Sequence, residues 1–129
     1  MASSDAELEA VDLEGDAREE LGRLLAASWR VTHRYGGLVL AAQAALPERD
    51  LREAHDKPAQ RWLRLLRRGR REGTVRTDMP LDWQLTTIQG VIHAASGAVH
   101  RGELPAERAP GLVRATVLAA LTPRGQPVP

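Results

Sequence analysis

Four histidines, one serine beside a glycine and a run of arginines are the residues that could support chemistry in this 129-residue chain. His93 and His100 lie on one side of an expected helix, but their spacing separates them by about 10 Å along its axis. A helical zinc site needs two histidines four residues apart, so we predict no metal site. Ser96 lacks the GxSxG pattern and a nearby acidic residue, so the sequence indicates neither a cofactor nor an enzyme.

The arginine run between Arg61 and Arg76 has two interpretations. Basic residues on one helix could contact the phosphates of a nucleic acid. However, no aromatic residue is interleaved on the same face, and the formal net charge of the whole chain is only +1. Both facts favour a solvated helix surface, which is the usual role of a charge run.

A small apolar ligand is a second candidate partner, and the aromatic residues suggest it. The chain has three tryptophans, one tyrosine and no phenylalanine, so each indole is a large share of its rigid apolar area. Trp29 and Trp62 could wall a cavity in which Gln89 and His93 form hydrogen bonds. The default interpretation is that the indoles are ordinary core anchors and that Gln89 and His93 belong to a partly exposed polar stripe. The predicted ligand-binding residues are Trp29, Thr32, Trp62, Leu66, Gln89 and His93.

Helical periodicity predicts an all-α chain of five helices with no strand. Asp16 is the expected N-cap of the first helix, paired glycines should interrupt it, and Pro58 should kink the third helix or mark a new start. Asp82 is the expected cap of the fourth helix, and Pro105 or Pro110 should open the last. The expected helices are 17–35, 38–46, 51–72, 83–101 and 112–121.

The expected helix 83–101 is the most apolar and offers two surfaces for packing. One face carries Leu85, Ile88, Ile92, Ala95 and Val99. The other carries small residues, which would let a second backbone approach closely. We expect this face to meet its own copy across a two-fold axis; packing against the last helix of the same chain is the alternative. The predicted dimer-interface residues are Trp83, Gly90, Ala94, Gly97, Val117 and Leu121.

Composition and length predict one domain without disulfides, because cysteine is absent. The acidic segment 1–15 has neither a basic start nor an apolar run, so we expect a disordered leader rather than a signal peptide. We assign residues 16–122 to the helical domain and 123–129 to a disordered tail. No apolar run reaches the roughly 20 residues that span a bilayer, so we expect a cytoplasmic protein that does not bind membranes.

The segment 65–81, LLRRGRREGTVRTDMPL, resembles the connection between the third-last and second-last helices of TetR-type transcriptional regulators. The shared pattern is G-x-x-x-G-x-hydrophobic-R-x-D, here Gly69, Gly73, Val75, Arg76 and Asp78. The resemblance extends over about residues 16–125. It includes the expected helix 17–35 with the glycine pair after it, and the expected helices 83–101 and 112–121.

This resemblance implies a TetR-type C-terminal domain, in which the last two helices form a four-helix bundle with a second copy and a small hydrophobic effector enters each bundle. The helix-turn-helix of the family is not recognisable in this sequence, so we expect DNA to be contacted only through an N-terminal domain that this sequence lacks. Two alternatives stay open: a stand-alone helical protein that pairs with a full-length regulator, and a small helical enzyme.

Overall fold

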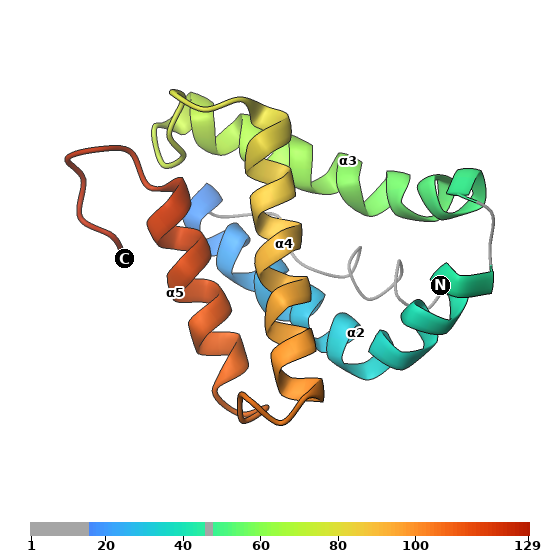
Figure 1. Ribbon diagram of the computed structural model, residues 1–129. Coiled ribbons are helices and arrows are strands. Elements are labelled where there is room, and N and C mark those ends of the chain that lie inside the picture. The colour runs from blue at the N-terminus through green and yellow to red at the C-terminus, as the bar shows by residue number, and fades with distance from the viewer. Residues whose placement is uncertain (1–15, 46–47) are drawn as a thin grey trace.

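The computed structural model describes the backbone of residues 16–45 and 48–129, and the side chains of residues 16–34 and 59–129. Within these ranges the chain is helical and has no strand (Figure 1). The helices are α2 (Ala17–Ala45), α3 (Glu48–Glu72), α4 (Leu81–His100) and α5 (Ala109–Leu121). The predicted all-α class is therefore confirmed. The expected leader 1–15 lies outside the described residues.

The predicted break at the glycine pair is wrong, and no new helix starts at Pro58. α2 runs without interruption through Gly36 and Gly37, which merges two expected helices into one. Glycine weakens a helix by about 1 kcal/mol but keeps its N–H, so the hydrogen-bond ladder continues through it. α3 likewise continues through Pro58, where the ladder loses one N–H. The described residues thus form four helices rather than the expected five.

α2 and α4 are the inner helices of the fold. Each of them contacts all three other helices, whereas α3 and α5 make no contact with one another among the described residues. α4 and α5 run antiparallel side by side, and they lie across α2 and α3 (Figure 1). α2 therefore organises the core together with α4.

Each helix contributes a side chain with no exposed surface to one continuous core. These four residues are Leu24, Leu66, Ile88 and Val117. The apolar face predicted for α4 is confirmed, because Ile88 and Ile92 are buried and the flanking apolar residues pack against the same core. No helix in the described ranges is both long and apolar enough to span a bilayer.

The helix ends confirm most of the expected signals. Oδ1 of Asp16 accepts a hydrogen bond of 2.8 Å from the Glu19 backbone N–H, which is an N-cap. Pro110 lies in the first turn of α5, where its missing N–H costs nothing. Asp82 is the exception: α4 begins at Leu81 with Pro80 as its N-cap, so Asp82 lies in the first turn. Its negative charge still suits the positive end of the helix dipole there.

Candidate functional site

The segment from Gly69 to Asp78 joins the end of α3 to α4 and α5. Gly73 has a φ of +79°, a left-handed conformation that ends α3 as expected from the sequence. A Cβ at Gly69 would lie 2.4 Å from Cγ2 of Val75, so only glycine lets the buried Val75 side chain pack on α3. The backbone N–H of Arg76 donates a 2.8 Å hydrogen bond to the oxygen of Leu121 at the end of α5. This segment therefore fixes the ends of α3 and α5.

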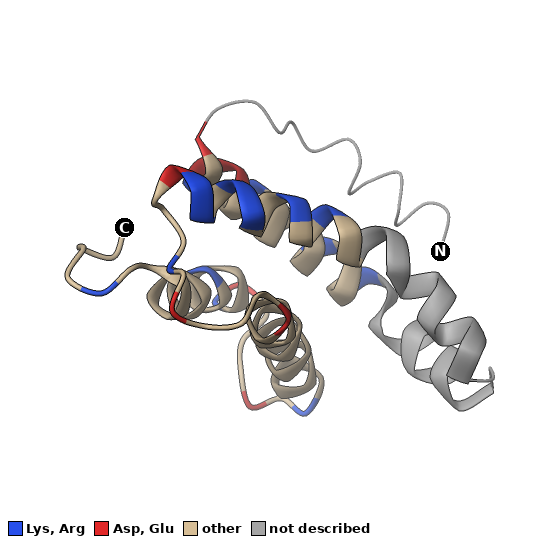
Figure 2. Ribbon diagram, turned by 90° about the horizontal axis from the view of Figure 1, so that it is seen from above, with Lys and Arg blue, Asp and Glu red and all other residues tan. Residues whose placement is uncertain are grey.

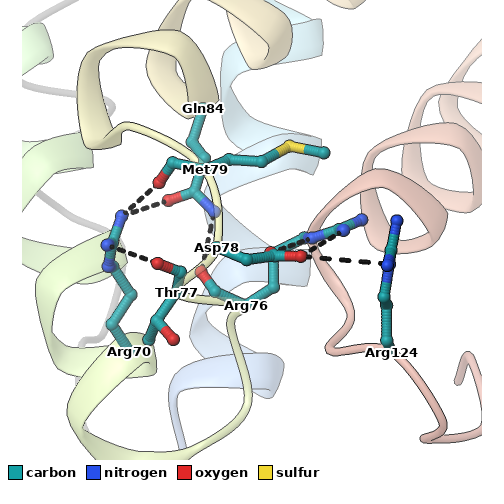
Figure 3. Close-up of polar contacts among 7 residues, drawn as sticks. All are labelled: Arg70, Arg76, Thr77, Asp78, Met79, Gln84 and Arg124. Carbon is teal, nitrogen blue, oxygen red and sulfur yellow. Dashed lines mark hydrogen bonds and ion pairs between the residues drawn. The ribbon is translucent and has the colours of Figure 1, made fainter.

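Gln84 and Arg70 form the centre of the polar network at this joint (Figure 3). Gln84 is only 1% exposed, and its Oε1 accepts a 3.1 Å hydrogen bond from Nη1 of Arg70. Its Nε2 donates a 2.9 Å hydrogen bond to the backbone oxygen of Arg76. Arg70 also donates to the backbone oxygens of Met79 at 2.9 Å and Thr77 at 3.2 Å. The end of α3 and the start of α4 are thus hydrogen-bonded to the loop between them.

Arg76 and Asp78 form a bidentate ion pair in the same loop. Nε and Nη2 of Arg76 donate to the two carboxylate oxygens of Asp78 at 2.6 and 2.8 Å. These hydrogen bonds from Arg76 lower the pKa of Asp78 to about 2. Nε of Arg124 lies 4.0 Å from the same carboxylate and also favours its charged form (Figure 3). Arg76 and Asp78 of the sequence motif therefore bind each other and stabilise the loop between α3 and α4.

The small-residue face of α4 is uncovered in this chain. Trp83 is 59% exposed, and Gly90 and Ala94 are also exposed. No atom lies within 4 Å of a Cβ built on Gly90. Gly97 is half-buried, and the guanidinium of Arg101 lies over it. The alternative in which the last helix of the same chain covers this face is therefore wrong.

Two of the predicted interface residues belong to the core instead. Val117 and Leu121 are buried within the chain, because this face of α5 packs against its own neighbouring helices. A partner helix would meet the opposite face of α5, where Leu112 is 42% exposed. The other exposed residues on that side are Gly111, Ala115, Thr116 and Ala119. Helical periodicity identified apolar residues on α5 but did not indicate which of them face the core of the same chain.

The predicted ligand-binding residues divide into two groups. Trp29, Trp62 and Leu66 are buried members of the same hydrophobic core. Thr32 and Gln89 are half-buried, and His93 is exposed on α4. The structure thus joins the two indoles to one core and leaves His93 at the surface.

Three sets of contacts in the structure were not predicted from the sequence. The rings of Trp29 and His33 stack with centroids 5.6 Å apart, and their i, i+4 spacing on a helix was the available signal. Gln84 gave no signal, because a lone glutamine in an amphipathic pattern does not reveal its partners. Arg68 pairs with Glu20 of α2 and with Glu72, and only the packing of α2 on α3 brings Glu20 there.

Comparison of the chain with family models, curated proteins and solved structures finds no match.

Proposed function

We propose that this chain is the effector-sensing and dimerisation domain of a TetR-type transcriptional regulator. The observation that carries the proposal is the open face of α4, with an exposed indole at Trp83 and small residues at Gly90 and Ala94. Exposed tryptophan is rare on a surface that contacts only water, and tryptophan is enriched where protein partners bind. In this proposal two copies pair through α4 and the exposed side of α5.

The charge distribution supports pairing through these two helices. Between Leu81 and His100 the only Asp, Glu, Lys or Arg is Asp82, and between Ala109 and Leu121 it is Arg114. Figure 2 shows α4 and α5 almost free of charged residues, while arginines follow α3 in the other layer. Depletion of charge is the compositional signature of an interface core.

A small hydrophobic effector would act by shifting the equilibrium between two arrangements of the helices. Such a ligand shifts a population only if it binds one arrangement more tightly than the other. The polar joint at Arg70 and Gln84 connects α3, which carries Trp62, to α4, which carries the proposed interface. A displacement of α3 by an effector near Trp62 would be passed to the interface through these hydrogen bonds.

Light scattering tests the dimer. The wild type should be dimeric at micromolar concentration, because pairing would cover the exposed Trp83 and the charge-poor faces of α4 and α5. Ala94→Arg should be monomeric, because like charges meet across the axis at a cost on the order of several kcal/mol when desolvated. Gln60→Arg is the matched control: it adds the same charge at an exposed position of α3 and should stay dimeric.

Trp83→Ala provides a second test that leaves the core of the chain untouched. Loss of an interface tryptophan typically costs about 2 kcal/mol or more, so the dimer dissociation constant should rise by roughly 30-fold. A wild type that remains monomeric well above micromolar concentration would overturn the proposal. A wild type that pairs only when mixed with a separate full-length regulator would favour the stand-alone interaction protein instead.

Binding of an apolar dye tests the effector site. Anilinonaphthalene sulfonate should bind the native chain, and Trp62→Phe should weaken its binding while the helix content stays unchanged.

Gel-shift titration tests the expectation that this domain does not bind DNA sequence-specifically. The domain should show only weak retention that disappears at moderate salt. A salt-resistant, sequence-selective complex with DNA would contradict the assignment of this domain.

A further inference from the structure

The outward side of α3 carries a stripe of three exposed arginines that the proposed function does not use. Arg64, Arg67 and Arg71 recur at helical spacing and are exposed, and we call them the α3 arginine stripe. Arg68 beside them is already paired with Glu20 and Glu72. The stripe spans about 10 Å along the helix axis. In Figure 2 the arginines of α3 lie in the layer that does not contain α4 and α5.

The leader, residues 1–15, has the complementary charge. It contains Asp5, Glu7, Glu9, Asp12 and Glu14 and no Lys, Arg or His. The whole chain has a formal net charge of +1, and the leader contributes −5, which leaves +6 for residues 16–129. The five charges of the leader therefore offset all but one of the net positive charges of residues 16–129.

The described residues place the start of α2 beside the stripe. Glu20 pairs with Arg68, and the Glu20 N–H donates a 3.1 Å hydrogen bond to the backbone oxygen of Asp16. Asp16 therefore lies one helical turn from a contact with α3. Glu14 is two residues away from Asp16, which is at most about 7 Å of extended chain. From Glu14 back to Asp5 the chain can extend about 30 Å, so its reach exceeds the length of the stripe.

We propose that the acidic leader docks along the α3 arginine stripe and shields it from other polyanions. A tethered segment needs no second molecule, and its effective concentration reaches the millimolar range, so weak exposed ion pairs suffice for docking. The contact is screened by salt, because the Debye length falls from about 30 Å at 0.01 M to about 3 Å at 1 M. This proposal is independent of dimerisation and of the effector.

Paramagnetic broadening in the full-length chain tests the docking. The chain has no cysteine, so Ala10→Cys accepts a single nitroxide label in the leader. At about 10 mM salt the label should broaden the amide signals of residues 60–71, and about 1 M salt should remove most of that effect. Neutralising the stripe with Arg64→Gln, Arg67→Gln and Arg71→Gln should reduce the broadening by roughly half or more. Far-UV circular dichroism should remain unchanged, because glutamine and arginine have similar helix propensities.

The matched control neutralises three exposed arginines elsewhere, with Arg30→Gln, Arg108→Gln and Arg124→Gln, and should leave the broadening unchanged. Unchanged broadening in the stripe variant, or equal losses in both variants, would overturn the proposal.

Shielding has its own measurement. A fluorescein-labelled oligothymidylate of about 20 nucleotides should bind the chain about tenfold more tightly at low salt when the five leader acids are replaced by their amides. The stripe variant should abolish that gain. Equal binding by the wild type and the leader variant would overturn the proposal, because the stripe would then be open to polyanions.

Discussion

Arg70 on α3 and Gln84 on α4 hold each other across the joint between the two helices, with Nη1 of Arg70 3.1 Å from Oε1 of Gln84. The same glutamine amide donates to the backbone oxygen of Arg76. One buried side chain therefore ties the end of α3, the connecting loop and the start of α4 together. The hydrogen bonds to loop oxygens from Arg70 extend the same joint.

Replacing Gln84 by leucine should destabilise the protein by about 2 kcal/mol. Leucine fills a similar volume but loses both hydrogen bonds, one of them to a charged guanidinium. Urea denaturation followed by circular dichroism measures the change in free energy of unfolding. Gln89→Leu is the control on the same helix and should change it by no more than about 0.5 kcal/mol. Equal effects of the two substitutions would contradict the role assigned to Gln84.

Gly69→Ala should destabilise the protein by about 1–3 kcal/mol. The added methyl would lie 2.4 Å from Cγ2 of Val75, so the buried valine or the backbone must move. Gly90→Ala is the matched control, because it lies within α4 and a Cβ there meets no atom within 4 Å. The free energy of unfolding of that variant should rise by about 0.5–1 kcal/mol, because alanine has a higher helix propensity than glycine. Both are compared by urea denaturation in the Ala94→Arg background, which removes dimerisation from the measurement.

The Arg76–Asp78 pair should make stability depend on pH in the acidic range. The pKa of Asp78 is lowered from 3.8 to about 2 by the hydrogen bonds from Arg76, so the folded state holds the ionised form. This contribution is fully present above the unfolded pKa and is lost as the pH falls from about 4 toward 2. The difference in stability between the wild type and Asp78→Asn should shrink over that window.

Urea midpoints measured across that pH range test this expectation. Glu107→Gln removes one exposed carboxylate elsewhere. Between about pH 4 and pH 2 its urea midpoints should lie closer to those of the wild type than the midpoints of Asp78→Asn do. A constant difference between the wild type and Asp78→Asn from pH 6 down to pH 2 would refute the link to this carboxyl group.

Asp16→Ala should cost about 1 kcal/mol, because the Glu19 N–H loses the side-chain oxygen that caps α2. Asp16→Asn keeps an oxygen at the same position and should retain most of the stability. Thermal unfolding monitored at 222 nm compares the variants, and helix fraying at the start of α2 should appear as faster amide exchange near Glu19. Similar losses in both variants would indicate that charge, rather than the cap, is responsible.

The sequence alone determined the helical class, the inward face of α4 and several helix ends. These features depend on local periodicity and on single residues, such as the cap at Asp16 and the left-handed Gly73. The same local rules failed at Gly36 and Gly37, because a glycine pair lowers helix stability without removing any hydrogen-bond donor.

Only the tertiary structure decided which surfaces remain free and which polar groups meet. The inward side of α5 follows from its packing on the other helices, and this placed Val117 and Leu121 in the core rather than at an interface. The partners of Gln84 and Glu20 come from elements distant in sequence, so no spacing rule could pair them with Arg70 or Arg68. Helical periodicity defines the faces of a helix, whereas the neighbouring helices determine which face is covered.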